Sequence, residues 1–474
     1  MQNTYNLKIR AIYLLPIIFL VFLIGQDENS SDTSKKETTG SIGTVTLNGQ
    51  VYNQLSLRPE IPIGNLGLGL DIYIYFNDKG MYWDSWNFSS LGSSYKTIID
   101  KIYYLRWGRP EDDFYLIAGA LPSVTLGKGI LVNNYSNIME YPQVRQVGLN
   151  IHSKLNRFKI ELINSNLKSS NPGILGFRAS ADIISNLSLG LSGVIDSDQL
   201  SGLPDSDGDS YPDYYDFYPD DSTKYDGKIE ADAQWKTLAN YLEDDADFNS
   251  WFSESSFYNE YNPANASKDP VSGFALDLSY MVYSKTVIYS QFAFLKGSLL
   301  NPVTKEKEKL GMGLVPLGLR GQLGPIKFLG EYRMGTERFI FSYWDRAYDL
   351  NRVSVLNSGL VTRESQLYQF GKLKGFYSEI DMSFINLFNF IIGYQNMKGE
   401  KWDTSKGVFK ENETNQSLSC TLSLNPAVIP KVGKLEAFYQ QSNVENPFVF
   451  KPDISTLLGY DLGIEMSAGM MLVY

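Results

Sequence analysis

The chain has 474 residues, of which 43% are hydrophobic, 14% aromatic and 20% charged, so it can bury a large core. Its formal net charge of −11 argues against a nucleic-acid partner, because binding of a phosphate backbone requires clustered Lys and Arg. A single His and a single Cys against 32 Tyr and 26 Phe favour strands and membrane-interface aromatics over catalytic or metal-binding side chains. No apolar run is long enough to span a membrane as a helix, so any membrane insertion must use strands.

The N-terminus has the order of a secretory signal. Lys8 and Arg10 precede an apolar stretch from Ala11 to Gly25, and a polar run follows. A retained N-terminal anchor is the alternative, because the small-residue cleavage pattern is weak. We predict a signal peptide over residues 1–26 and a disordered linker over residues 27–42, and therefore export from the cytoplasm.

Large apolar residues recur at every second position in many segments. From Leu66 to Phe76 the even positions are large and apolar while the odd positions hold Gly, Asp or Tyr, and the same period of two returns over 187–192, 274–282 and 417–424. About seventeen such segments, mostly of 9 to 13 residues, match the length of a tilted strand that crosses a bilayer. A soluble sandwich, the alternative for any single strand, has shorter strands.

The connections between these segments alternate in length. Short turns are expected near residues 109–111, 154–156, 184–186, 284–285, 322–324, 386–387 and 425–431. Longer connections are expected near residues 78–96, 122–143, 167–173, 197–270, 297–307, 342–372, 399–413 and 444–458. Outer-membrane barrels pair short periplasmic turns with long outer loops, so the alternation favours a membrane barrel.

The C-terminus reads as one strand that ends at an aromatic residue. One face of this strand holds Ile464, Met466, Ala468, Met470, Leu472 and Tyr474. This end resembles the terminal signal by which barrel-assembly machinery recognises its substrates, which makes that machinery an expected partner. Counting back from Tyr474 at the periplasmic rim gives sixteen strands from Leu66 onward, within a range of 14 to 18. The strand-like segment 43–56 is then left over; it enters the lumen, lies below the barrel, or shows that the count is wrong by one.

In architecture, residues 66–474 resemble uncharacterised porin-like outer-membrane proteins of Gram-negative bacteria. The resemblance implies an all-β fold, an antiparallel transmembrane β-barrel within residues 43–474 whose proper strands begin at residue 66. It also implies contact with outer-membrane lipid and a channel for small hydrophilic solutes.

The longest connection, the acidic insertion of residues 197–270, contains a calcium-binding pattern. Over residues 205–216, acids occupy positions 1, 3, 5, 9 and 12, from which an EF-hand loop supplies oxygen ligands. The stretch resembles thrombospondin type 3 repeats. The expected ligands of a structural Ca²⁺ are Asp205, Asp207, Asp209, the carbonyl of Tyr211, Asp213 and Asp216. Ser210 at position 6 and Asp216 in place of Glu predict weaker binding than in an intracellular sensor. The alternative is an ordinary solvated acidic loop.

If the large apolar face meets lipid, the other face places charged residues in the lumen. The residues expected to line a pore are Asp71, Arg178, Asp182, Asp277, Lys327, Glu331, Arg333, Glu379, Asp381, Glu436 and Glu465. A water-filled pore with such an acidic wall would prefer cations. The alternative is a plugged barrel filled with salt bridges. The connection 122–143, partly apolar and poor in charge, is expected to fold inward as a constriction.

Two other functions compete with the channel. A non-enzymatic surface adhesin or assembly component would use the barrel only as an anchor for the calcium-bearing loop. An outer-membrane hydrolase would need a base and a nucleophile grouped on the rim. His152 is the sole imidazole and no GxSxG elbow or zinc motif accompanies it, so a non-enzyme is expected.

Overall fold

The computed structural model describes part of the chain. The described residues are 38–47, 50–139, 141, 144–167, 173–206, 212–214, 218–219, 269–283, 285–300, 307–356, 359–384, 387–403, 405–424, 432–449, 451, 456–467 and 470–473. The predicted signal peptide, the linker up to residue 37 and most of the acidic insertion lie outside them.

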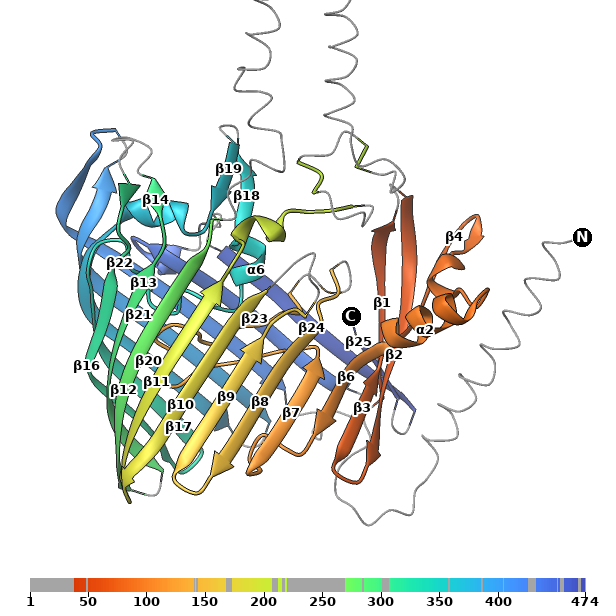
Figure 1. Ribbon diagram of the computed structural model, residues 1–474, viewed down its shortest axis with the longest axis horizontal. Coiled ribbons are helices and arrows are strands. Elements are labelled where there is room, and N and C mark those ends of the chain that lie inside the picture. Colours follow the sequence, from red (N-terminus) through yellow and green to blue (C-terminus); the bar gives the residue numbers. More distant parts are fainter. Residues whose placement is uncertain are drawn as a thin grey trace, which may run out of the picture.

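The described chain is built almost entirely of strands (Figure 1). The strands are β1 (Thr38–Leu47), β2 (Gln50–Ile63), β3 (Leu66–Leu70), β4 (Ile72–Asn77), β5 (Gly80–Met81), β6 (Ile102–Trp107), β7 (Phe114–Gly119), β8 (Gly148–Leu155), β9 (Phe158–Asn164), β10 (Ile174–Ile184), β11 (Leu187–Asp196), β12 (Val271–Tyr283), β13 (Thr286–Lys296), β14 (Leu299–Leu300), β15 (Lys307–Glu308), β16 (Met312–Leu323), β17 (Ile326–Gly335), β18 (Val353–Leu356), β19 (Gly359–Thr362), β20 (Phe370–Phe384), β21 (Phe388–Asp403), β22 (Val408–Leu424), β23 (Val432–Val444), β24 (Thr456–Ser467) and β25 (Met470–Val473). The helices are η1 (Asp84–Trp86), α2 (Leu91–Asp100), η2 (Gln199–Gly202), α6 (Tyr348–Asn351), η4 (Ser365–Gln369) and η5 (Pro447–Val449). None of these helices is long and apolar enough to cross a membrane.

The main sheet has 21 strands, and from β6 to β25 its long strands pair with their neighbours in chain order. Short turns join strand pairs at one edge, for example between β10 and β11 and between β16 and β17, as the sequence predicts. The longer connections, including β14, β18 and β19, lie at the opposite edge (Figure 1). The alternation of short and long connections is therefore confirmed from β6 to β21. It is wrong at the longer connection predicted over 399–413, because β21 and β22 remain paired as far as Asp403 and Val408 and leave only residues 404–407 between them.

The predicted total of sixteen strands is not confirmed. Taking β3 and β4 as one strand interrupted at Asp71, sixteen strands run from Leu66 to Ser467, but the sheet also includes β1, β2 and β25. The unassigned segment 43–56 belongs to the β1–β2 hairpin, and β1 already begins within the predicted linker. The prediction treated this segment as a single strand, whereas the structure divides it between β1 and β2 and extends β2 to Ile63.

The C-terminal strand is divided in two. The structure folds the end of the chain into a hairpin, in which β25 turns back to pair antiparallel with β24. β25 then lies parallel to β1 over four residues, whereas every other pairing of described strands in this sheet is antiparallel. The prediction of a single terminal strand is therefore wrong. The structure also does not show an even-stranded barrel closed by an antiparallel pair of strands. Apolar alternation continues through Ser467–Met470, so the pattern alone does not reveal a turn there.

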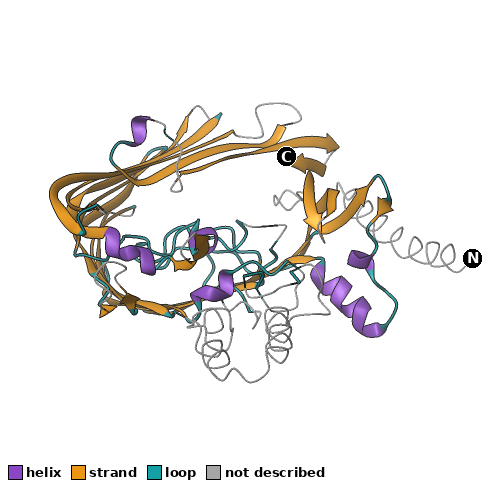
Figure 2. Ribbon diagram, turned by 90° about the horizontal axis from the view of Figure 1, so that it is seen from above, coloured by secondary structure: helices purple, strands orange, loops and turns teal. Residues whose placement is uncertain are grey.

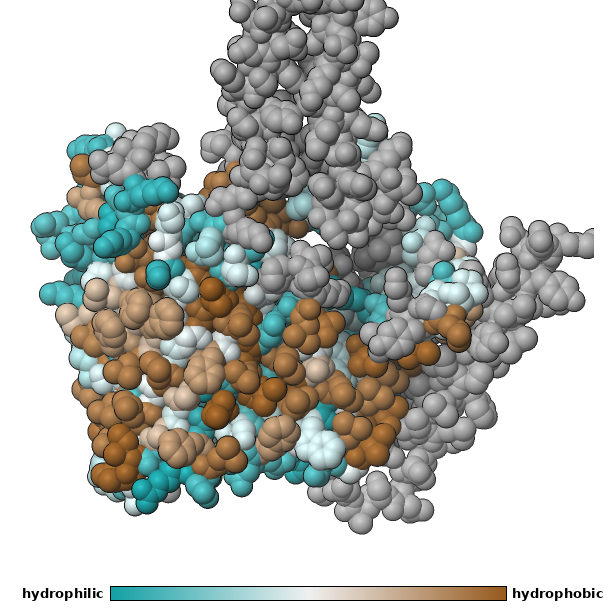
Figure 3. All heavy atoms as spheres, in the orientation of Figure 1, coloured by the Kyte–Doolittle hydropathy of each residue, from teal (hydrophilic) through white to brown (hydrophobic). Residues whose placement is uncertain are grey.

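The outer face of the sheet carries the large apolar side chains. On β12, Phe274 and Leu276 are 44% and 46% exposed, whereas the alternate residue Asp277 is 4% exposed. The same arrangement gives an apolar surface over the middle of the wall, with polar residues towards its edges (Figure 3). A soluble protein buries its large apolar face, so this polarity fits a wall that faces lipid.

The inner face is covered by connections rather than by water alone. Viewed from above, the strands curve around a space in which loops and short helices lie (Figure 2). Small and polar residues point inward, and they include a buried ion pair in which both nitrogens of the Arg178 fork donate to Asp277. Ser192 and Glu161 add further contacts to the same guanidinium.

We predict that Asp277→Ala lowers the free energy of unfolding by about 3–5 kcal/mol, because it leaves the Arg178 charge buried without its main partner. Denaturant unfolding in lipid vesicles measures this. The control is Lys327→Ala, which breaks a 2.9 Å pair to Asp381 at a side chain that is 65% exposed and should cost less than about 1 kcal/mol. Equal effects of the two substitutions would contradict the prediction.

Candidate functional site

Two connections fold into the space enclosed by the sheet and pack on each other. These infolded loops are residues 120–147, which follow β7, and residues 336–369, which follow β17. Backbone hydrogen bonds join the two loops. The amide of Trp344 donates to the carbonyl of Leu131 at 3.0 Å, and the amide of Asn133 donates to the carbonyl of Trp344 at 3.1 Å. The inward folding predicted for 122–143 is confirmed in its described residues.

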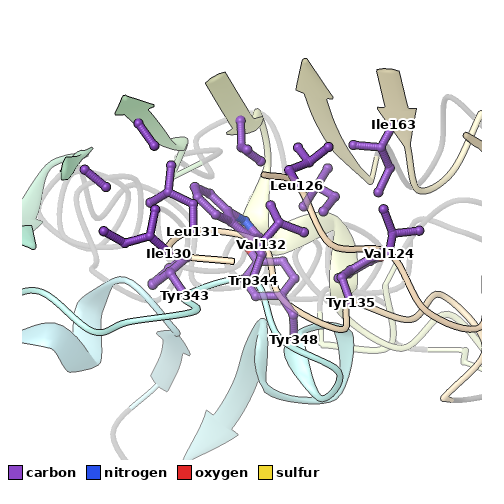
Figure 4. Packing of buried hydrophobic residues seen from close by; sticks show 14 of the residues in the cluster. Val124, Leu126, Ile130, Leu131, Val132, Tyr135, Ile163, Tyr343, Trp344 and Tyr348 are labelled. Carbon is purple, nitrogen blue, oxygen red and sulfur yellow. The ribbon is translucent and has the colours of Figure 1, made fainter. Parts of the chain in front are cut away.

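Apolar side chains of the infolded loops fill the space beneath β9 to β13. Trp344 is 0% exposed and lies at the centre of this packing (Figure 4). The other buried members from the loops are Leu121, Val124, Leu126, Ile130, Leu131, Val132, Tyr135, Phe339, Tyr343, Tyr348 and Leu367. They meet small or branched inward residues of the wall, among them Ile163, Val194, Ala275 and Ala293. This half of the interior is therefore packed as a core.

Hydrogen bonds fix the second infolded loop to the wall. Tyr348 donates its hydroxyl to Asp196 at 2.7 Å, and Arg352 forms a bidentate pair with the same carboxylate at 2.6 and 2.8 Å. Tyr135 of the first loop donates to Asp349 at 2.7 Å. Because Asp196 ends β11, the second loop is tied to the end of that strand, and Tyr135 joins the first loop to the second.

Two carboxyl groups in the second infolded loop are held in surroundings that disfavour their charge. Burial raises the pKa of Asp349 to about 6, although hydrogen bonds from Tyr135 and Gln146 favour its ionised form. Burial, together with the neighbouring carboxylate of Asp269, raises the pKa of Glu364 to about 8. Packing of these loops is therefore expected to weaken as the pH rises and these carboxyl groups ionise.

The other half of the interior holds a cavity of about 1020 Å³. Its wall consists of the inner faces of β16, β17 and β20 to β23, and the infolded loops close it from the opposite side. Adjacent strands present hydroxyl and amide groups side by side: Ser419 lies between Gly393 and Gln440, and Ser423 lies between Asn389 and Glu436. Such a surface can bind and hydrate small polar molecules.

Charges of both signs line this cavity. The cations are Lys285, Arg320, Lys327, Arg333, Arg346 and Arg363, and the carboxylates are Asp345, Glu379, Asp381 and Glu436. Three of the cations are paired: Lys327 with Asp381 at 2.9 Å, Arg333 with Glu331 at 2.7 Å and Arg363 with Asp345 at 3.1 Å. The lining that the structure describes is therefore not an acidic wall.

The residues predicted to line a pore fall into several groups. Those that line the cavity are Lys327, Arg333, Glu379, Asp381 and Glu436. Arg178 and Asp277 instead lie buried beside the first infolded loop, and Glu331 is buried against Tyr289 and Arg333. Asp71 is buried where β3 gives way to β4, paired with Arg58 at 3.3 Å and with Arg145 at 3.1 Å. Asp182 accepts a hydrogen bond from Ser188, and the side chain of Glu465 lies outside what is described. Alternation finds the inward face but cannot tell which inward residues a loop will cover.

Several cavity residues were missed from the sequence. Asp345, Arg346 and Arg363 belong to the second infolded loop, and Lys285 to the turn before β13. Arg320 lies on β16. The pairing of β16 with β13 shifts in register around Ser290, and its pairing with β17 shifts around Pro316, so the alternation is interrupted. A period of two reports only on regular strands, so no sequence signal placed these residues inside.

The predicted calcium ligands are described only in part. Asp205 and Asp213 are described, and Ser206 donates from its amide and hydroxyl to the two carboxylate oxygens of Asp213 at 2.8 and 2.7 Å. Asp207, Asp209, Tyr211 and Asp216 lie outside the described residues. Among described residues, no three His, Cys, Asp or Glu side chains group as metal ligands. The calcium site stays a prediction.

His152 lies on β8, opposite Glu161 in the register and with its ring centroid 5.5 Å from that of Tyr115. It is therefore placed on the wall between two strands, away from the infolded loops and the cavity lining.

Comparisons with known proteins give only distant structural likeness. No family model and no curated protein matches the chain. OpdQ of Pseudomonas aeruginosa has a TM-score of 0.37 at 10% identity, covering 82% of this chain and 84% of OpdQ. OccAB4 of Acinetobacter baumannii has a TM-score of 0.35 at 9% identity, covering 90% of this chain and 94% of OccAB4. Wzi of Escherichia coli, a carbohydrate-binding outer-membrane barrel involved in capsule assembly, has a TM-score of 0.38 at 11% identity, covering 91% and 84%. Similarity at this level decides neither fold nor function, so both rest on the sheet and its interior.

We predict that Trp344→Ala lowers the free energy of unfolding by about 3–5 kcal/mol, because it opens a void where the two infolded loops and the wall meet. Limited proteolysis should also cut the infolded loops faster. Leu350→Ala is the matched control, since Leu350 lies in the same loop but is 40% exposed. Resistance to protease equal to that of the wild type would contradict the packing.

We predict that the infolded loops are held more tightly at about pH 5 than at about pH 7.5. The pKa of Asp349 lies above its ordinary value, so its contribution to stability is complete below about pH 4 and is lost as the pH rises through about 6. Hydrogen exchange of the loop amides measures this. Asp349→Asn combined with Glu364→Gln, which imitates both protonated acids, should remove most of the difference, and an undiminished difference would refute the assignment.

Proposed function

We propose that this chain is a porin-like channel of the outer membrane for small hydrophilic solutes. The observation that carries the proposal is a polar cavity of about 1020 Å³ inside a sheet whose outer face is apolar. A barrel that only anchors a surface loop does not require a polar cavity. The volume of this cavity is of the size that accommodates small molecules. The infolded loops narrow the space and leave one side of it open to polar solutes.

The infolded loops also limit the channel. They pack the half of the interior beneath β9 to β13 as a core, so solutes would travel along the half lined by β16 to β23. The path is thus off-centre, with a strand wall on one side and a loop wall on the other. Such a pore selects by contact with side chains and not by size alone.

The preference for cations stays a prediction, and the described lining does not favour it. Six cationic and four anionic side chains surround the cavity. Three of the acidic residues that suggested a cation-selective wall, Asp71, Asp277 and Glu331, are paired with Arg and buried.

Calcium binding by the acidic insertion is likewise part of the proposal. Asp205 and Asp213 lie in the described part of the pattern, and Asp213 is already held close to Ser206. The insertion follows β11, begins with η2 and starts at the edge that carries the long connections. A structural Ca²⁺ there would stiffen a surface loop without taking part in transport. Barrel-assembly machinery that recognises the C-terminal strands remains the proposed partner.

We predict that the purified protein produces discrete conductance steps in planar bilayers and, in cells, fractionates with outer membranes. Conduction follows from a hydrated path along β16 to β23. Heat-modifiable migration on gels reports that the barrel is folded. If folded protein never conducts above the bare bilayer, either intact or without residues 122–143, the channel is refuted and the role of a loop-bearing surface protein takes its place.

We predict that Ca²⁺ at about 1 mM raises the protease resistance of residues 197–270 and that Mg²⁺ does not, in keeping with oxygen-rich extracellular calcium sites. Terbium luminescence titration gives the affinity. Asp205→Asn combined with Asp209→Asn should abolish both effects. Asp244→Asn, an acid of the same insertion outside the pattern, is the control. Equal loss in the control variant would mean a diffuse acidic loop and no site.

A further inference from the structure

A cation of the loop wall contacts an aromatic ring of the strand wall in this cavity. Arg346 belongs to the second infolded loop, and its Cζ lies 5.0 Å from the centroid of the Phe438 ring. Phe438 lies on β23, where it is opposite Thr421 in the register. Both residues line the cavity. The guanidinium therefore stands where the two walls approach each other.

The backbone that carries Arg346 is fixed on both sides. Ser342 donates its amide to Ile130 at 2.9 Å, and Trp344 donates to Leu131 at 3.0 Å. Beyond Arg346, the amide of Ala347 donates to the carboxylate of Asp345 at 3.1 Å. Tyr343, Trp344, Ala347 and Tyr348 are buried, whereas Arg346 is half-buried. The loop thus presents this one long cation to the cavity from a rigid base.

The charge of Arg346 is not compensated by its neighbours. The adjacent carboxylate of Asp345 is engaged by Arg363 at 3.1 and 3.3 Å. Within the described residues, no carboxylate lies at ion-pair distance from Arg346, and its Nε is buried without a hydrogen-bond partner. The contact with the Phe438 ring satisfies the cation only partly, since a cation–π contact is weaker than an ion pair in a polar site.

We propose that Arg346 is the residue that sets the charge selectivity of this channel, favouring anions over cations where it faces Phe438. The inference rests on the proposed function and deepens it. A fixed cation in a narrow, partly dehydrated passage raises the local concentration of anions and repels cations. Lys327, Arg333 and Arg363 contribute less because each is held by a carboxylate. Lys285 and Arg320 contribute less because both are exposed, so that water and salt screen their charge.

Reversal potentials in a KCl gradient across a planar bilayer test this inference. Arg346→Gln should raise the ratio of potassium to chloride permeability roughly tenfold, because a unit charge about 6 Å away in water changes the energy of each ion by about one RT, in opposite directions for potassium and chloride. Arg346→Lys keeps the charge and should keep the wild-type ratio. Lys374→Gln is the matched control: it removes the same charge from an exposed position on β20 outside the cavity lining, and should change nothing.

A second measurement restores charge in the folded channel. In a Cys420→Ser background, Arg346→Cys is labelled with a cationic or an anionic methanethiosulfonate reagent. The cationic label should return the permeability ratio towards wild type, and the anionic label should raise it further. If the channel conducts but its permeability ratio changes with neither the substitution nor the labels, this inference is overturned and the proposed function stands. Folded wild-type protein that does not conduct overturns the proposed function, and this inference with it.

Discussion

The organisation of this molecule depends on one constraint: a sheet whose outer surface is apolar must satisfy its backbone by strand pairing and must place its charges inside. In lipid there is no water to pair with an open amide or carbonyl, so each strand needs a hydrogen-bonded neighbour. The inward face then collects charged side chains such as Arg178, Glu331 and Arg333, which must find partners or water. The remaining features of the structure follow from how this interior is filled.

The interior is filled in two ways. Beneath β9 to β13, the infolded loops bring Leu131, Tyr135 and Trp344 against small wall residues and cover the Arg178–Asp277 pair. Along β16 to β23 the inner face of the wall has more Ser, Asn and Gln than beneath β9 to β13. It therefore offers no comparable apolar surface on which a loop could pack. The side chains on the inner face of the wall therefore determine where the packed core of the infolded loops ends and the cavity begins. Asp196 joins the two halves, because its pair with Arg352 fixes the second loop to the strand that borders this packed core.

Strand type, facing and most turns could be predicted from the sequence, because each follows from a local period of two. The alternation of Phe274, Leu276 and Leu278 against Asp277 predicts correctly which side faces outward. The hairpin of β24 and β25 could not be predicted, since its turn lies within a continuing apolar pattern. The cavity lining was half predicted: Glu379 and Asp381 follow from strand alternation, whereas Arg346 and Arg363 occupy a loop whose path is set by long-range packing on Trp344. Local periodicity carries no information about such packing.

The split of the cavity between a strand wall and a loop wall has a consequence for how such a protein can change over time. A one-residue insertion in β20 to β23 would exchange every inward and outward side chain and expose charge to lipid. A change of side chain between Ser342 and Arg346 alters the other wall without touching the lipid-facing surface, provided that Trp344 remains as the anchor. In the proposed channel, the strand wall of the cavity is therefore conservative and the loop wall is free to vary, so new solute preferences can arise without remaking the fold.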